Sequence, residues 1–257
     1  MLSDRQLQRY SRQLLMPDFD IEGQLKLRAA TVLVVGLGGL GSPAALYLAG
    51  AGVGCLLLAD GDKVELSNLQ RQIAHTQADI GSNKAASAAA SVAAINDDCA
   101  VEVLDKQLCD ADLPELLARA DLVVDASDNY PIRFSLNRAC IAAAVPLVSA
   151  AAVRSEGQLS VFDPVRGGPC YRCLYPDDSA ESALSCSQSG VLAPVVGVLG
   201  SLLAMEAIKV LSGHGESLRG SVLLVDLKAM EFRKLGLPRR EGCPDCGHLP
   251  LLLKTSH

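Results

Sequence analysis

The sequence TVLVVGLGGLGSPAALYLAGAGVGCLLLAD, from Thr31 to Asp60, has the pattern of one β-α-β unit. The short β-branched run Val32–Val35 predicts a buried strand, and Pro43–Ala51 predicts the helix after a glycine turn. A second apolar run, Cys55–Ala59, predicts the next strand, which ends at Asp60. This order of elements is typical of a Rossmann-like nucleotide-binding unit.

The glycines between the first strand and the helix form the pattern G-x-G-x-x-G. Gly36 permits a tight turn, Gly38 and Gly39 let the backbone approach a phosphate or ribose, and Gly41 lets the helix pack on the strand. Asp60 is placed to accept hydrogen bonds from ribose hydroxyls. The loop alone favours NAD(P) or FAD, so a nicotinamide-dependent oxidoreductase is one interpretation.

The rest of the chain extends this pattern into an α/β fold. Alternating apolar runs predict a Rossmann-like, mostly parallel sheet with helices on both faces. After Arg154 the pattern changes, and GQLSVFDP and SVLLVDLKAMEFRKLGL predict antiparallel strands. We expect a single domain over residues 1–257, with N-terminal helices and a nucleotide-binding half in 1–150 and a second half in 151–257. Residues 16–23 are expected to form a loop between the N-terminal helices.

Composition excludes several classes of function. The chain has 257 residues, a net charge of −6 and 49% hydrophobic residues, so a nucleic-acid partner is disfavoured because phosphate binding needs a basic surface. The polar N-terminus predicts no export signal, and no membrane span is expected because glycine, proline or charge interrupts each apolar run. We therefore expect a cytoplasmic protein, in which nine cysteines do not form a disulfide framework.

Polar side chains follow the strand ends and favour a triphosphate over a dinucleotide. Lys84 opens a predicted helix, and Asp128 and Asn129 follow a predicted strand. The segment after Asp60 adds further candidate ligands, namely Ser67, Asn68, Leu69, Gln70 and Arg71. Cations neutralise phosphate oxygens and a carboxylate holds Mg²⁺, whereas hydride transfer needs neither. Taken singly, Lys84 has an alternative as a solvated lysine, and Asp128 as the cap of the next helix.

Two C-x-x-C pairs predict a metal site. Cys170 and Cys173 form one pair, and Cys243 and Cys246 form the other. Four thiolates close the coordination shell of a tetrahedral zinc, so we expect structural Zn²⁺ and not a redox pair, which is the alternative. Cys186 lies in a polar loop before a long apolar helix, where it is either a mobile nucleophile or a non-essential thiol.

Segments spread in order along nearly the whole chain match one known family. They are RYSRQ, VGLGGLGSPAALYLAGAGVG, DGDKVELSNLQRQ, GSNKA, ASDN, PLVSAAAVRSEGQLSVF, PCYRCLYP, GVLAPVVGVLGSLLAMEAIK and GCPDCG. The ordered set resembles the MoeB/ThiF family of sulfur-carrier adenylyltransferases, bacterial relatives of the ubiquitin-activating enzymes. That family uses Mg-ATP to adenylate the Gly-Gly carboxylate of a ubiquitin-like sulfur carrier in molybdopterin or thiamin biosynthesis, and it usually forms homodimers.

The resemblance implies roles for individual residues. Gly39 would lie against the nucleotide, Asp60 would bind the ribose, and the phosphate contacts would come from Asn68, Arg71 and Lys84. Asp128 would hold Mg²⁺ beside Asn129, Arg12 would reach the γ-phosphate from the partner subunit, and Cys186 matches a cysteine that some relatives join covalently to the carrier. Residues 151–257 would be the carrier-binding and zinc half, and sulfur would come from a separate donor protein. A non-catalytic scaffold that binds ubiquitin-like proteins is the remaining alternative.

Overall fold

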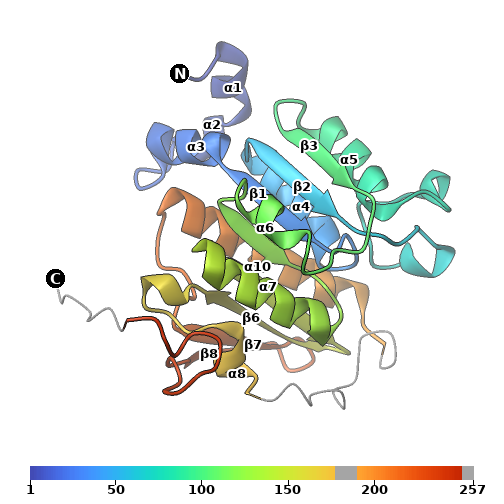
Figure 1. Ribbon diagram of the computed structural model, residues 1–257. Coiled ribbons are helices and arrows are strands. Elements are labelled where there is room, and N and C mark those ends of the chain that lie inside the picture. Colours follow the sequence, from blue (N-terminus) through green and yellow to red (C-terminus); the bar gives the residue numbers. More distant parts are fainter. Residues whose placement is uncertain (177–189, 251–257) are drawn as a thin grey trace.

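A computed structural model describes residues 1–176 and 190–250, and its strands form one eight-stranded sheet (Figure 1). The spatial order is β3-β2-β1-β4-β5-β6-β7-β8. Strands β3, β2, β1, β4 and β5 are parallel, whereas β6, β7 and β8 are antiparallel to their neighbours. The predicted fold class is confirmed. The bounds are β1 Thr31–Val35, β2 Cys55–Ala59, β3 Ala100–Leu104, β4 Leu122–Asp125, β5 Leu147–Val153, β6 Glu156–Phe162, β7 Ser221–Asp226 and β8 Glu231–Gly236.

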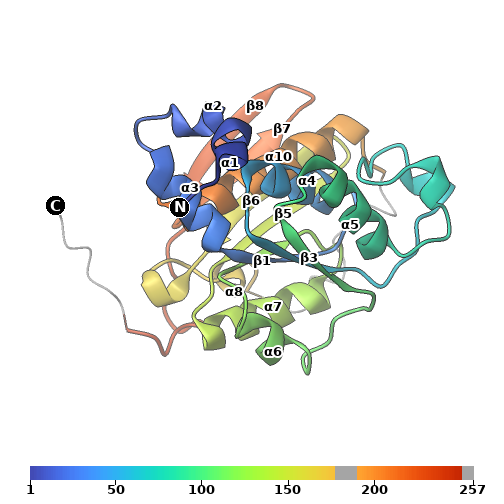
Figure 2. The same ribbon diagram turned by 90° about the horizontal axis from the view of Figure 1, so that it is seen from above.

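Helices cover both faces of the sheet, as Figure 2 shows. One core joins α4, α5 and α10 to side chains of β1 such as Val32 and Val34. The other joins α6 and α7 to Leu33 and Val35, which point to the opposite face because side chains alternate along a strand. The helices are α1 Asp4–Arg9, α2 Ser11–Leu14, α3 Asp20–Ala29, α4 Gly41–Ala51, α5 Lys84–Ile95, α6 Leu113–Leu117, α7 Tyr130–Ala143, α8 Tyr171–Leu174 and α10 Ala193–Ser212.

The long apolar helix α10 lies in the core. In the described part of the chain it is the one helix whose length and composition suffice to cross a membrane. Leu199, Leu203 and Ala207 of this helix are fully buried, and α10 packs against α3, α4, β5 and β6. Its hydropathy is accounted for by this burial.

Strand order reverses between β1 and β4, and this position fixes the site. The chain runs outward from β1 to β2 and β3, and then returns to β4 on the other side of β1. The loops after β1 and β4 therefore diverge and leave a crevice at the carboxyl ends of the strands, which is where open α/β sheets bind ligands.

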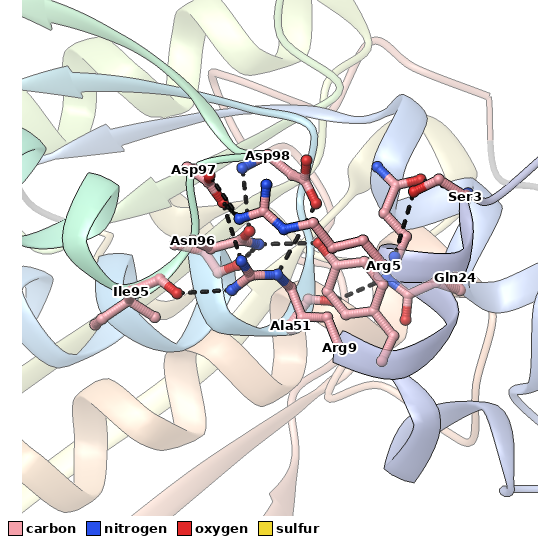
Figure 3. Close-up of polar contacts among 12 residues, drawn as sticks. Ser3, Arg5, Arg9, Gln24, Ala51, Ile95, Asn96, Asp97 and Asp98 are labelled. Carbon is pink, nitrogen blue, oxygen red and sulfur yellow. Dashed lines mark hydrogen bonds and ion pairs between the residues drawn. The ribbon is translucent and has the colours of Figure 1, made fainter.

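Hydrogen bonds and ion pairs attach the N-terminal helix α1 to the carboxyl end of α5 (Figure 3). Arg5 binds both carboxylate oxygens of Asp97 at 2.5 and 2.6 Å, and Arg9 donates to the Ile95 carbonyl at 2.8 Å and to Asp97 at 3.0 Å. Each exposed pair contributes little by itself. Together they attach α1, which directly precedes the short helix that carries Arg12.

The expected loop at residues 16–23 is shorter in the structure. Helix α3 begins at Asp20, inside that range. The Asp20 carboxylate accepts a hydrogen bond from the backbone N–H of Glu22 at 2.7 Å, which satisfies one of the N–H groups left free in the first turn of a helix.

Candidate nucleotide-binding site

A cavity of about 930 Å³ opens at the carboxyl ends of the parallel strands. The glycine turn after β1 forms one wall, the segment after β2 forms the second, and the loop between β4 and α7 forms the third. The cavity brings together most of the residues predicted from the sequence, namely Gly36, Gly38, Gly39, Asp60, Asn68, Arg71, Lys84, Asp128 and Asn129.

The glycine turn is set by two backbone requirements. Gly36 has a φ angle of +89°, and a methyl group on it would lie 2.8 Å from the carbonyl oxygen of Ala126. A methyl group on Gly41 would lie 1.8 Å from the carbonyl oxygen of Gly36. Both positions therefore need glycine, as the sequence predicted for the turn and for the packing of helix on strand. Gly41 itself is not among the lining residues.

Asp60 connects the end of β2 to the glycine turn. Its two carboxylate oxygens accept the backbone N–H groups of Leu37, at 2.7 Å, and Asp62, at 2.9 Å. Burial raises the pKa of Asp60, and the two N–H groups oppose that shift. Each oxygen retains a second lone pair, so the carboxylate can still accept hydrogen bonds from the hydroxyls of a ribose.

The cavity has a larger share of basic side chains than the rest of this acidic protein. Six basic and four acidic side chains line it, whereas the whole chain has a net charge of −6. The basic residues are Lys63, Arg71, Lys84, Lys106, Arg133 and Arg138, and the acidic residues are Asp60, Asp62, Glu65 and Asp128. Such a lining attracts an anion while its carboxylates remain available to a metal ion.

Lys84 is held inside the cavity wall. The side chain of Asn83 caps α5 by accepting the Ala86 N–H at 3.0 Å, and this fixes the start of the helix at Lys84. The ammonium of Lys84 lies 2.9 Å from a carboxylate oxygen of Asp62, with the lysine side chain 9% exposed and that of Asp62 58% exposed. The alternative of a solvated lysine is therefore wrong.

Asp128 and Asn129 have different roles at the start of α7. The side chain of Asn129 accepts the N–H of Ile132 at 3.2 Å and is the N-cap of the helix. The alternative in which Asp128 caps this helix is wrong, because its neighbour takes that position. Asp128 is exposed and lines the cavity, where its oxygens suit a hard cation such as Mg²⁺.

Some predicted residues lie away from this cavity. Ser67, Leu69 and Gln70 do not line it. Within the 3₁₀ turn Leu66–Asn68, Asn68 is buried and lines the cavity, whereas Ser67 is exposed. Arg12 is exposed on α2 and is also absent from the lining. Cys186 lies outside the described residues. The nucleotide, partner-subunit and nucleophile roles of these residues stay predictions.

The structure adds residues that the sequence did not single out. Gln72 lines the cavity and is 3% exposed, and its side-chain oxygen has no hydrogen-bond partner in the described part of the chain. The sequence feature that could have identified Gln72 is its four-residue spacing from Asn68. The Gln72 N–H donates to the Asn68 carbonyl at 3.1 Å. Buried Arg133 reaches the cavity from α7 and donates to the carbonyls of Ser127 and Ala150, and no local pattern marks it.

A second, smaller cavity adjoins the first. Its volume is about 400 Å³, and it is lined by residues of the adjacent strands β5, β6, β7 and β8 together with Tyr130 and Tyr175. Tyr130, Ala151 and Val153 line both cavities. Among the residues that line only the smaller one are Gln158, Tyr175, Leu224, Asp226, Glu231 and Arg233.

The four predicted metal-binding cysteines converge. Their sulfur atoms all lie within 4.8 Å of one another, and the pairs Cys170–Cys173, Cys170–Cys243 and Cys173–Cys246 are 3.8, 3.6 and 3.5 Å apart. Sulfurs bound at about 2.3 Å to a tetrahedral zinc are about 3.8 Å from one another. The cluster is therefore compatible with a closed zinc site.

Helix α7 links this cluster to the nucleotide cavity. The side chain of Asn137 donates to Asp245 at 2.7 Å, within the second C-x-x-C pair, and accepts the Tyr171 N–H at 2.7 Å, within the first. Arg172 lies 3.2 Å from the same Asp245 carboxylate. Two turns earlier, Asn129 begins the helix at the cavity wall, so one rigid element touches both sites.

Comparison with known proteins agrees with this geometry. The chain is 49% identical over 246 residues to molybdopterin-synthase adenylyltransferase of Escherichia coli strain K12, covering 96% of this chain and 98% of that protein. It is 48% identical to sulfur carrier protein ThiS adenylyltransferase of the same organism, with 96% and 97% covered. The crystal structure of E. coli MccB with ATP superposes with a TM-score of 0.81 at 26% identity, covering 93% and 74%. Residues 10–245 match the ThiF family, and the chain belongs to that family.

Proposed function

We propose that this protein uses ATP to adenylate the C-terminal carboxylate of a small ubiquitin-like sulfur-carrier protein, with release of pyrophosphate. The observation that carries the proposal is the cavity in which Asp60 and the glycine turn face Arg71 and Lys84. The family relatives named as adenylyltransferases for molybdopterin synthase and for ThiS support it. The pathway served is molybdopterin or thiamin biosynthesis.

Electrostatics explains why the reaction needs such a cavity. The attacking group is a carboxylate, and the group attacked is the α-phosphate of a polyanion. Arg71 and Lys84 offset the charge that develops on the phosphate oxygens, and both already line the cavity before the ligand arrives. A general base is unnecessary because the carboxylate is already ionised at neutral pH.

We assign the nucleotide contacts accordingly. Gly39 lies against the nucleotide, Asp60 binds the ribose hydroxyls, and Asn68 joins the two cations at the phosphates. Asp128 is the residue that would hold Mg²⁺, which supplies further positive charge at the triphosphate. When ATP enters, the Lys84 ammonium turns from the Asp62 carboxylate to a phosphate. Water then replaces the ammonium at the exposed Asp62 carboxylate.

The smaller cavity is the route for the tail of the carrier. A Gly-Gly terminus is thin and extended, and it must reach the α-phosphate from outside the nucleotide cavity. The two cavities share Tyr130, Ala151 and Val153, so a chain that runs past β5 enters one from the other. The residues at the outer wall would then contact the carrier.

The wider assembly is part of the same proposal. We propose a cytoplasmic homodimer, in which Arg12 reaches the γ-phosphate of the partner subunit and a separate protein donates the sulfur. Cys170, Cys173, Cys243 and Cys246 hold structural Zn²⁺, which attaches the C-terminal segment to α7 and α8. Cys186 is the candidate nucleophile toward the carrier, and acylation of its thiol by the carrier would demonstrate that role.

The test is carrier-dependent exchange of labelled pyrophosphate into ATP, with each candidate Gly-Gly carrier in turn. Exchange with one carrier supports adenylation and names the pathway. No exchange with any carrier, from dimeric and zinc-loaded protein, favours the scaffold alternative. Reduction of a nicotinamide cofactor by a substrate would favour the oxidoreductase alternative, for which Arg71, Lys84 and Asp128 have no use.

A further inference from the structure

His75 is a buried histidine that lies behind the walls of the nucleotide cavity. It is 6% exposed and is not among the residues that line the cavity. Its Nε2 atom lies 3.0 Å from the carbonyl oxygen of Leu37, within the glycine turn. Its Nδ1 atom lies 2.8 Å from the hydroxyl oxygen of Ser87, on α5. The ring therefore spans the space between the turn and the helix that begins with Lys84.

The partners of His75 determine where its proton lies. A carbonyl oxygen can only accept a hydrogen bond, so Nε2 carries the proton and donates it to Leu37. Nδ1 is then free to accept the hydroxyl proton of Ser87. Burial lowers the pKa of His75, which agrees with a neutral ring that uses both nitrogens.

The peptide that His75 binds is the centre of the glycine turn. The N–H of Leu37 donates to Asp60 at 2.7 Å, and its carbonyl accepts from Ser42 at 3.1 Å as well as from His75. Leu37 is fully buried and lies between Gly36 and Gly38. A turn that contains several glycines is flexible unless its peptide groups are held, and these bonds hold this one.

His75 follows the segment that forms the second wall of the cavity, and its backbone is bonded to that segment. Its backbone N–H donates to the carbonyl of Gln72 at 3.1 Å, and the N–H groups of Arg71 and Gln72 donate to the carbonyl of Asn68 at 3.0 and 3.1 Å. The segment that carries Asn68, Arg71 and Gln72 is therefore joined to His75 by consecutive backbone hydrogen bonds. The His75 side chain thus connects two walls of the cavity. The glycine turn presents backbone groups to the phosphates, and the segment with Asn68, Arg71 and Gln72 presents side chains.

We propose that His75 is a positioning residue for nucleotide binding, which acts through the carbonyl of Leu37 without touching ATP. This inference rests on the proposed function insofar as the ligand is ATP. It follows that loss of the Nε2 donor loosens the turn and the orientation of Asp60. The cost appears in the affinity for ATP, because the binding energy must then order these groups.

The experiment compares three variants of the zinc-loaded, full-length protein. His75→Phe keeps a planar ring and removes both hydrogen bonds. His75→Gln restores a donor to Leu37, since the amide nitrogen of glutamine has a reach similar to that of Nε2. Ser91→Ala is the matched control, because it removes a 2.6 Å bond between α5 and the Ala74 carbonyl, one residue from His75, and leaves the glycine turn untouched.

ATP binding is measured by calorimetry without carrier, and kinetic constants are measured by pyrophosphate exchange. We expect His75→Phe to weaken ATP binding about tenfold, which is the size of one buried hydrogen bond. The KM for ATP should rise by the same factor, with kcat and the KM for the carrier within about twofold. His75→Gln should recover most of the affinity, and Ser91→Ala should keep all of it.

Other outcomes overturn the inference. Wild-type ATP affinity in His75→Phe refutes it, even if the melting temperature falls, because His75 would then only stabilise the fold. Equal loss of affinity in Ser91→Ala also refutes it, since loosening of the whole segment would explain both. ATP binding by the unchanged chain without exchange on any carrier would refute the proposed reaction alone, whereas absence of ATP binding would refute both.

Discussion

Replacing two glycines of the same turn should separate folding from nucleotide binding. In Gly36→Ala the new methyl group meets the Ala126 carbonyl at 2.8 Å, and the φ angle of +89° is strained for any residue with a Cβ atom. The left-handed backbone costs about 1–2 kcal/mol, and overpacking against an atom that cannot rotate away adds about 1–3 kcal/mol. We expect Gly36→Ala to lower the free energy of unfolding by about 2–5 kcal/mol.

Gly38→Ala is the matched variant, because its environment is different. The nearest atom to the new methyl group is the side-chain nitrogen of Gln72, at 3.6 Å, which is an ordinary contact. The free energy of unfolding should stay within about 1 kcal/mol of the wild-type value or rise slightly, since alanine restricts the unfolded chain. Gly38 lines the cavity, so the methyl group occupies space that a nucleotide needs, and ATP binding should weaken.

The assay is urea unfolding of the zinc-loaded protein, paired with ATP calorimetry on each variant. A loss of about 2–5 kcal/mol corresponds to a fall of roughly 5–15 °C in the melting temperature for a chain of this size. Equal stability of the two variants would refute the reasoning, because it would mean that the Ala126 contact and the φ angle of Gly36 carry no energy. Unchanged ATP affinity in Gly38→Ala would remove the glycine turn from the nucleotide site.

Four further changes test other parts of the site. Asp128→Asn should lower pyrophosphate exchange by at least about 100-fold at unchanged melting temperature, and full activity would remove the metal assignment. Lys84→Met should lower kcat/KM by about 10–100-fold through loss of a charged phosphate contact, whereas exchange assays on Lys63→Met, an exposed neighbour, should show a much smaller effect. Zinc chelation or Cys243→Ser should lower the melting temperature before ATP binding fails, as parallel calorimetry would show. Asp97→Asn should speed hydrogen exchange in α1 with a stability loss below about 1 kcal/mol, and unchanged exchange there would mean that the arginine contacts do not hold the helix.

Local patterns were sufficient for much of this molecule. The β-branched run at Val32–Val35, the glycine spacing and the acid at position 60 are set within thirty residues, so the first β-α-β unit was predictable. The two C-x-x-C pairs were also predictable, because each pair is a local turn and four sulfurs favour one shared centre. Both features depend on neighbours in sequence and not on packing.

Residues placed by long-range packing were not predictable in the same way. Arg133 reaches the cavity only because α7 packs under β4 and β5, and His75 reaches Leu37 across 38 positions of the sequence. Adjacent Asp128 and Asn129 are both residue types that cap helices, and the structure places Asn129 in the N-cap position, with the extended backbone angles typical of that position. Gln70 is exposed and does not line the cavity, although it lies between Asn68 and Gln72, which do.

Strand β5 and Tyr130 of α7 form the wall that the two cavities share, and this limits how the carrier specificity of the protein can be changed. A substitution at Ala151 or Val153 alters the space for the nucleotide and the space for the carrier tail together. The outer wall, with Leu224 on β7 and Arg233 on β8, borders only the smaller cavity. Divergence among duplicated copies of such a gene, or laboratory selection for a new carrier, can therefore proceed through β7 and β8 while ATP use is preserved.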